Sequence, residues 1–301
     1  MLYTYLKIAY RNLIRNRVFS ILNIFGLSIG LSACLLIIHY VYFELNYDTF
    51  HKNAADIYRI QLNTWQDGVL ETQSAWTPPA IASLSEKEFP EVKRSSRLLN
   101  NAGGMGLITY KKKNFNEEDI YFAESAFLDM FSFPVKQGNV NKALSEPYQL
   151  ILTESIARKY FGTKNPIGQV LHLESDGGFG DFKVGGVLYD IPENSHVKFN
   201  VLLSWPTLAK SIGVAQDDNW NFNHIYTYLH LNQSADPDQV NKKLNALIYK
   251  HQGEKLKKNN TRLESKLQPL RDIYLYSDLR NEARVNSNAT TFFYWLLRFL
   301  S

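Results

Sequence analysis

The sequence predicts an α+β protein with one N-terminal transmembrane helix, followed by a two-lobed domain outside the cytoplasm. Three observations predict this: an uncharged apolar stretch near the N-terminus, a group of cations before it, and a long polar segment after it in which strand-like and helix-like patterns alternate. The 301 residues are 45% hydrophobic, so the chain can bury a core and is not disordered.

Positive charge is concentrated at the N-terminus. The first 17 residues contain Lys7, Arg11, Arg15 and Arg17 and no acidic residue, whereas the remaining residues carry 29 basic and 29 acidic side chains. The net charge of +4 therefore reflects a basic N-terminus, and we expect no nucleic-acid partner. Cations in this position are typical of the cytoplasmic flank of a membrane span.

Residues 1–17 are predicted to form a cytoplasmic amphipathic helix. Lys7, Arg11 and Arg15 recur every four residues, and Leu6 and Leu13 fall on another face. With Arg17, these cations are predicted to lie at the membrane surface, near lipid headgroups. A helical extension of the membrane span with positive flanks fits the same pattern, and both interpretations stay open.

The next 26 residues, 18–43, carry no formal charge and are predicted to form the transmembrane helix. As an α-helix they would rise about 39 Å, more than the roughly 30 Å of a bilayer's hydrocarbon core, so they can span it with some tilt. Gly26 and Gly30 form a G-x-x-x-G pair, with Ala33 nearby. Such small residues let a second helix approach closely, so these three are predicted to form a helix-packing surface.

The only cysteine, Cys34, allows two interpretations of this stretch. The run LSAC (31–34) could be the cleavage and lipidation site of a bacterial lipoprotein signal. However, the apolar stretch continues beyond Cys34, whereas the apolar part of a signal ends near its cleavage site. An uncleaved membrane helix is therefore favoured. One cysteine also excludes an internal disulfide framework and a multi-cysteine zinc site.

Residues 44–104 and 216–285 are predicted to form one split α/β lobe. The stretches 56–65 and 224–232 alternate like strands, and each is followed by a helical pattern and a second strand-like stretch. Two β-α-β units at the two ends of one region suggest a split ferredoxin-like fold. Thr77 is expected to cap the first of the two helices.

The segment between them, residues 105–215, is predicted to form an inserted β-rich lobe. Most of its patterns are strand-like, and 150–162 reads as a strand followed by a short helix that Thr153 caps and Gly162 ends. The basic run 111–113 is interpreted as a solvated hairpin tip and not as a site for an anionic partner.

The sequence shows no candidate active site. It lacks a Walker A motif, a dinucleotide fingerprint, an H-E-x-x-H zinc motif and a nucleophile elbow. His224 and His230 lie on one face of a predicted strand, but no carboxylate or cysteine completes a ligand set. We therefore expect no catalytic residue, cofactor or metal, and no enzymatic activity.

Several longer stretches together resemble the FtsX-like, MacB-type permeases of ABC transporters, in the form common in Bacteroidetes. The stretches are LKIAYRNLIRNRVFSILNIFGLSIGLSACLLI (6–37), FELNYDTFHKNAADIYRIQ (43–61), AESAFLDMFSFPVKQGN (123–139), LILTESIARKYFGTKNPIGQVL (150–171) and FKVGGVLYDIPENSHVKFNVLLS (182–204). The resemblance extends over roughly residues 6–275, and its motifs are structural, not catalytic.

The resemblance implies a porter-like α/β lobe with an inserted β-rich lobe, in a subunit of the bacterial inner membrane. The N-terminus would be cytoplasmic and residues after about 44 periplasmic. The implied partners are a cytoplasmic ABC ATPase in trans, a second permease subunit in a homo- or heterodimer, and membrane lipid. The implied function is export or mechanotransmission that couples the ATPase to events in the periplasm. No substrate follows, because substrates in the family vary.

The C-terminal residues depart from the family pattern. Members have at least three further spans, whereas residues 286–301 contain an apolar run of six residues before Arg298, interpreted as the stub of a second span. This predicts a permease truncated before the later spans. The alternative is a single-span, membrane-anchored extracytoplasmic module that binds a ligand or senses a signal.

Overall fold

A computed structural model describes residues 2–101, 104–175, 178–212 and 217–283. The molecule consists of two compact units, Met1–Asn46 and Tyr47–Ser301. The predicted stub of a second span, 286–301, lies outside the described residues.

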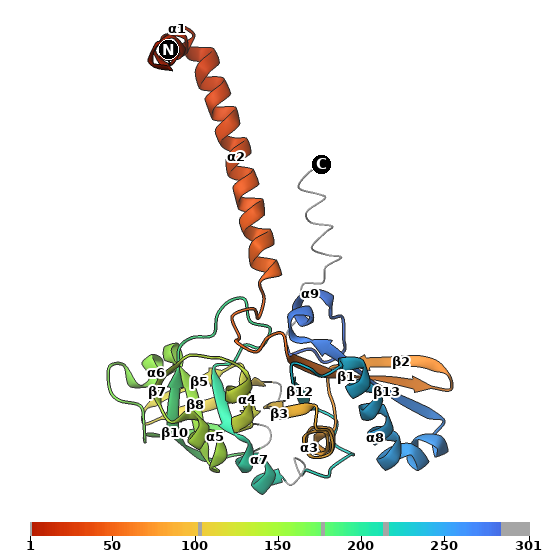
Figure 1. Ribbon diagram of the computed structural model, residues 1–301. Coiled ribbons are helices and arrows are strands. Elements are labelled where there is room, and N and C mark those ends of the chain that lie inside the picture. Colours follow the sequence, from red (N-terminus) through yellow and green to blue (C-terminus); the bar gives the residue numbers. More distant parts are fainter. Residues whose placement is uncertain (1, 102–103, 176–177, 213–216, 284–301) are drawn as a thin grey trace. The chain divides into compact units, whose positions relative to one another are not determined.

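The N-terminal unit is formed by two helices, α1 (Leu2–Arg15) and α2 (Arg17–Leu45). Asn16 separates them because its backbone, with φ −109° and ψ 55°, is not helical. Figure 1 accordingly shows α1 turned across the end of α2, so the two do not form one straight helix. The location of α1 at a membrane surface stays a prediction. Within the described residues, α2 is the one helix long and apolar enough to cross a membrane.

The second unit is built on a single mixed sheet. Among the described residues its main path runs β13-β1-β12-β3-β6-β11-β8-β10-β9-β4-β5, with β2 paired to β1 and β7 paired to β10 (Figure 1). The strands are β1 (Ile57–Gln66), β2 (Val69–Ser74), β3 (Val92–Asn100), β4 (Gly106–Tyr110), β5 (Lys113–Glu117), β6 (Ile120–Ala123), β7 (Val135–Gly138), β8 (Gln149–Thr153), β9 (Val170–Glu174), β10 (Asp181–Leu188), β11 (Val201–Ser204), β12 (Tyr226–Leu231) and β13 (Thr261–Pro269).

Helices pack on both faces of this sheet. They are α3 (Pro79–Glu88), α4 (Ser125–Met130), α5 (Val140–Ser145), α6 (Glu154–Phe161), α7 (Trp205–Ile212), α8 (Pro237–Lys258), the 3-10 turn η2 (Leu270–Asp272) and α9 (Ile273–Tyr276). The predicted class is therefore confirmed: an α+β protein in which one candidate membrane helix precedes a sheet-rich domain.

The two predicted β-α-β units are β1-α3-β3 and β12-α8-β13. Their strands interleave in the order β13-β1-β12-β3, and each is antiparallel to its neighbours, as a split ferredoxin-like unit requires. β3 also pairs with β6, so the sheet continues into the inserted residues without a break. The limits predicted for the two lobes, 104/105 and 215/216, stay a prediction.

Buried side chains form three clusters. One packs α3 and α8 against the β13-β1-β12-β3 part of the sheet, and a second packs α6 and α7 against the strands from β6 to β4. The third covers the other face along both parts, under α4, α5 and α9. Ile57 belongs to this third cluster and Ile60 to the first, as alternation along a strand requires.

Two predicted helix caps are wrong. Thr77 is fully buried and its hydroxyl bonds to Thr227 Oγ1 at 2.7 Å, across the sheet, so it cannot reach the start of α3. Thr153 occupies the N-cap position of α6 but makes no capping bond. Asp190, from a neighbouring loop, takes this role instead: its carboxylate accepts the N–H of Ser155 at 2.8 Å.

Candidate functional site

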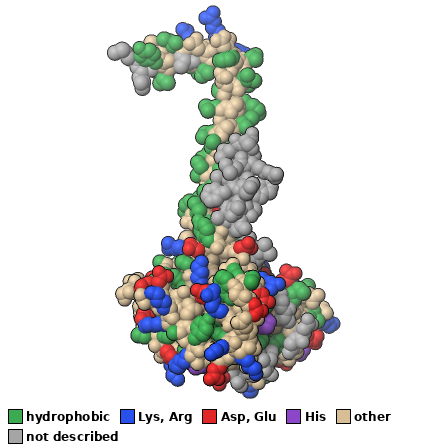
Figure 2. Space-filling view, turned by 90° about the vertical axis from the view of Figure 1, so that its right-hand side faces the viewer, with side chains coloured by type: hydrophobic (Ala, Val, Ile, Leu, Met, Phe, Trp, Pro, Cys, Tyr) green, Lys and Arg blue, Asp and Glu red, His purple; other side chains and the backbone are tan. Residues whose placement is uncertain are grey.

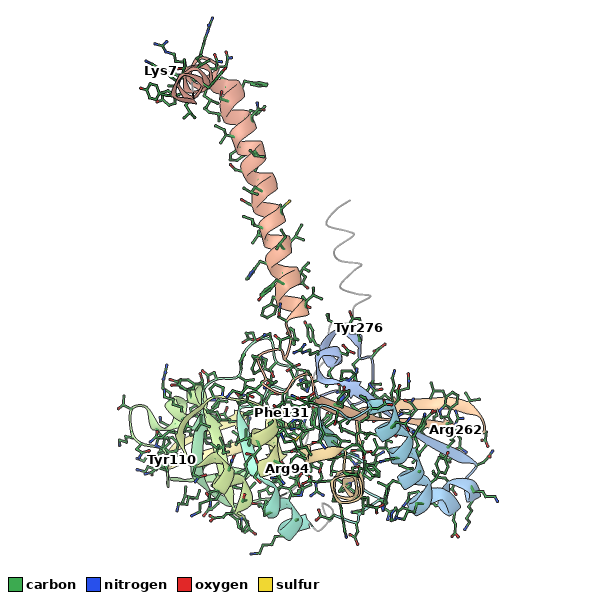
Figure 3. The ribbon with its side chains drawn as sticks, in the orientation of Figure 1. Lys7, Arg94, Tyr110, Phe131, Arg262 and Tyr276 are labelled. Carbon is green, nitrogen blue, oxygen red and sulfur yellow. The ribbon has the colours of Figure 1, made fainter. Side chains whose placement is uncertain are left out.

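The cations predicted to lie at the membrane surface are exposed in the N-terminal unit. Lys7, Arg11 and Arg15 lie on α1 at intervals of four residues and therefore on one side of that helix. Figure 2 shows blue side chains of α1 on its upper side, and Figure 3 labels Lys7 there. Arg17 begins α2, and its Nε donates to Ile14 O at 3.3 Å. Their contact with lipid stays a prediction.

The three residues predicted for helix packing share one side of α2. Gly26, Gly30 and Ala33 are exposed and spaced at i, i+4 and i+7. A Cβ added at Gly26 or Gly30 would meet no atom within 4 Å. This side of α2 is therefore open within the described chain, and its contact with a second helix stays a prediction.

A site that the sequence did not reveal lies where two segments of the second unit meet. The entry segment, residues 47–56, connects α2 to β1 in the sequence, and the return segment, residues 270–283, follows β13. The ring of Tyr47 stacks on the ring of Tyr274, with centroids 3.3 Å apart and an interplanar angle of 2°. Figure 3 labels Tyr276, which ends α9 in the return segment. We call the contact region of these two segments the junction.

Asp48 anchors the entry segment inside the domain. It is fully buried, and its N–H donates to Asn194 O at 2.8 Å. Its Oδ1 accepts the N–H of His196 at 3.1 Å and the hydroxyl of Ser195 at 3.4 Å. The His196 Nδ1 lies 2.9 Å from Asp48 Oδ2 but does not form a hydrogen bond with it. Residues 194–196 thus hold the start of the entry segment.

His51 fills the space beside Asp48. Its side chain is fully buried, with ring centroids 5.0 Å from Phe131 and 4.9 Å from Phe133. The His51 Nδ1 accepts the N–H of Ser132 at 3.0 Å, so the proton of the neutral ring is on Nε2, 3.8 Å from Asp48 Oδ1. Burial lowers the pKa of His51 from 6.5 to about 4, although Asp48 opposes this effect, and the ring is neutral at pH 7.

Tyr228 connects this group to the centre of the sheet. Its hydroxyl lies 2.9 Å from Nε2 of His196. Tyr228 on β12 stands opposite Arg59 on the adjacent strand β1, so the two side chains are cross-strand neighbours. Burial raises the pKa of Tyr228 well above 10, which keeps its hydroxyl neutral.

Arg59 binds the return segment from inside the domain. Its side chain is fully buried, and its Nη2 donates to Glu282 Oε1 at 2.8 Å, Ser277 Oγ at 2.9 Å and Gln268 Oε1 at 2.6 Å. Its Nη1 donates to the second oxygen of Glu282, whose side chain is 11% exposed. This is a bidentate ion pair, the arrangement in which arginine and carboxylate interact most strongly.

Five buried or nearly buried side chains therefore join the entry segment to the return segment through the domain. They are Asp48, His196, Tyr228, Arg59 and Glu282. Removing one partner from such a group leaves a buried polar or charged atom unpaired, so the contacts resist separation of the two segments. Within the described residues no group of His, Cys, Asp or Glu is placed to hold a metal ion.

The sequence contained no clear signal for this site. Arg59 shares its strand face with Gln61 and Asn63, so the alternation along β1 places it on the polar face and does not indicate its burial. Asp48, His51 and His196 lie in stretches that carried the family resemblance, but their spacing in the sequence does not indicate that they meet. Glu282 lies 223 residues from Arg59, so no local pattern could have linked them.

The fold and the junction define a class: an α+β domain whose first segment follows a candidate membrane helix and is fixed inside the domain by buried polar contacts. Residues 20–247 match the family model of the MacB-like periplasmic core domain. The chain belongs to this family, as its motifs predicted.

Three solved structures are similar to this chain to different extents. A domain of a candidate permease protein from Porphyromonas gingivalis aligns with a TM-score of 0.63 and 22% identity, covering 82% of this chain and 98% of that one. The periplasmic region of MacB from Actinobacillus actinomycetemcomitans has a TM-score of 0.49 and 16% identity, covering 70% and 88%. The extracellular domain of the ABC-type transporter YknZ from Gram-positive bacteria has 0.48 and 16%, covering 68% and 98%. No curated protein sequence matches the chain.

Proposed function

We propose that the chain is all or part of a permease subunit of an ABC-type export or mechanotransmission system, which couples a cytoplasmic ATPase to events in the periplasm. One observation carries the proposal: the family match begins inside α2, at residue 20, and ends in α8, at residue 247. The apolar helix and the domain are therefore parts of one family unit, which is typical of a permease and not of a soluble binding protein.

The junction supports a coupling role for the domain. A movement of α2 reaches the domain through the entry segment, because that segment is the covalent connection between them. Asp48 holds the entry segment to residues 194–196, where His196 contacts Tyr228 of β12, and Arg59 of the adjacent strand β1 holds the return segment. Both segments therefore move with the domain as one piece, which is what transmission of a displacement requires.

The proposed orientation places α1 in the cytoplasm and the sheet-rich domain in the periplasm. The cations Lys7, Arg11, Arg15 and Arg17 favour the cytoplasmic side. Gly26, Gly30 and Ala33 would contact a helix of a second permease subunit, as a homo- or heterodimer. ATP hydrolysis would be supplied by the separate ATPase, so the chain itself needs no enzymatic activity.

Co-purification from native membranes tests the proposal. We expect a chromosomal copy tagged at its N-terminus to bring down an ABC ATPase in near-equal amount, and variants Gly26→Leu and Gly30→Leu to lose the second permease subunit. Val18→Leu, on the same helix outside the small-residue surface, is the matched control. A chain that is isolated alone, with no ATPase, would contradict the proposal and favour the single-span binding or sensory module.

A further inference from the structure

The surroundings of His51 are built for its uncharged form. The ring packs edge-on against Phe131 and Phe133, and two titratable groups act on it: Asp48 of its own segment and His196 of the loop before β11. Other charged side chains of the packed elements are directed elsewhere: Lys52 and Asp129 are exposed, and Lys198 donates to Pro192 O. Asp48, the carboxylate that lies 3.8 Å from His51 Nε2, already accepts hydrogen bonds from Ser195 and His196.

The hydrogen bond at Nδ1 excludes a second proton on His51. Nδ1 accepts the backbone N–H of Ser132 at 3.0 Å, which requires a lone pair. In the protonated ring both nitrogens carry hydrogen, so Nδ1–H would point at the N–H of Ser132 and neither group would have an acceptor. An unmade bond of this kind in a buried site costs about 1–3 kcal/mol, beyond the cost of burying the charge.

Opening of the entry segment removes this conflict. The segment is held by short-range backbone bonds, from His51 N to Asp48 O at 3.3 Å and from Ala54 N to His51 O at 3.1 Å. It is held to the rest of the domain by the Asp48 contacts with 194–196 and by Lys52 N, which donates to Ser132 Oγ at 3.0 Å. A segment that leaves 131–133 and 194–196 exposes His51 to water, where it can carry a proton.

We propose that the entry segment is an acid-sensitive latch: proton uptake by His51 releases residues 47–56 from residues 131–133 and 194–196 and loosens the junction. The latch extends the proposed function, because it makes the connection between α2 and the domain depend on periplasmic pH. This consequence rests on the proposed function. The release itself is a local change in the domain and can be observed without an ATPase.

The sign and size of the effect follow from the two states of His51. In the closed state its pKa is about 4, and in the open state it has the ordinary value of 6.5. The open state therefore binds more protons between these values, so opening becomes more favourable as the pH falls through that window and is unaffected above it. Between pH 8 and pH 5 the equilibrium constant for opening should rise about 30-fold.

Amide hydrogen exchange of the full chain in detergent micelles, corrected for the intrinsic pH dependence of exchange, tests the latch. The expected result is an approximately 30-fold loss of protection in residues 47–56 between pH 8 and pH 5. Protection in β8, residues 149–153, should not change. His51→Asn can keep an oxygen acceptor for the N–H of Ser132 but does not titrate, so its entry segment should show no such pH dependence; His51→Gln serves if that variant does not fold.

Two results would overturn the proposal. One is an entry segment in the unaltered chain that is equally protected at pH 8 and pH 5. The other is the same loss of protection in the His51 variants, which would mean that another group takes up the proton. Neither result bears on ATPase binding, which the co-purification tests separately, so failure of the latch and failure of the permease role are distinguishable.

Discussion

Glu282→Ala is expected to lower the free energy of unfolding by about 3–5 kcal/mol, because it leaves the fully buried guanidinium of Arg59 without its carboxylate. Gln268 and Ser277 still accept from Nη2, but neither can neutralise the charge. Urea unfolding of the full chain in micelles, followed by tryptophan fluorescence, measures the loss.

An exposed ion pair supplies the matched control. Arg94 lies 3.2 Å from Glu86, with its side chain 52% exposed, so Arg94→Ala should cost less than about 1 kcal/mol (Figure 3). The double variant Arg59→Leu with Glu282→Leu should recover much of the loss, since it buries no unpaired charge. Equal effects of Glu282→Ala and Arg94→Ala would show that Arg59 and Glu282 do not pair in the folded chain.

Phe131→Ala is expected to cost about 3–5 kcal/mol, the usual loss for an aromatic ring removed from a tightly packed core. Its ring is fully buried, with centroids 4.6 Å from Phe127, 5.0 Å from His51 and 5.1 Å from Tyr228. The void would lie beside His51 and admit water, so the pKa of His51 should return toward 6.5. Hydrogen exchange should therefore show less pH dependence in the entry segment than in the unaltered chain.

Two other phenylalanine substitutions test whether the loss of stability depends on the volume that the buried ring fills. Phe131→Leu keeps most of the volume and should cost about 1 kcal/mol, with the pH dependence of the entry segment retained. Phe115, at the edge strand β5, is 38% exposed, so Phe115→Ala should have a small effect by the same unfolding measurement. If Phe131→Ala were as mild as Phe115→Ala, the cluster would not be the packed support that the junction requires.

Much of the fold could be predicted because it depends on local patterns. The 26 uncharged residues predicted α2, and the alternation at 56–65 and 224–232 predicted β1 and β12 together with their interleaved arrangement. The two cap predictions were wrong because of contacts between residues distant in the sequence. Thr77 has a partner on β12, and Asp190 from the loop after β10 reaches the start of α6. Local propensity does not contain such tertiary contacts.

The junction could not be predicted from the sequence for the same reason, on a larger scale. Asp48 contacts residues 194–196, and Arg59 contacts Glu282; the partners are 148 and 223 residues apart in the sequence. Arg59 lies on the strand face that also carries Gln61 and Asn63, so alternation did not indicate its burial. The predicted site residues, in contrast, depend on spacing within one helix, which is why Gly26, Gly30 and Ala33 do lie on one side of α2.

Membership of the family of MacB-like periplasmic core domains is the basis on which we propose a role for the junction. Under the proposed function, the domain responds to an ATPase and needs a firm connection to its membrane helix. The buried contacts from Asp48 to Glu282 are of that kind, and His51 adds a point at which the connection can be released.

The proposed coupling role is tested most directly by hydrogen exchange at the junction, in the complex of this chain with the ATPase that co-purification is expected to identify. Exchange is measured in the entry and return segments without nucleotide and with a non-hydrolysable ATP analogue, with β8 as the internal reference. The proposed function predicts that protection of residues 47–56 and 270–283 changes together on ATP binding. Unchanged protection in both segments, in a complex that binds ATP, would contradict it.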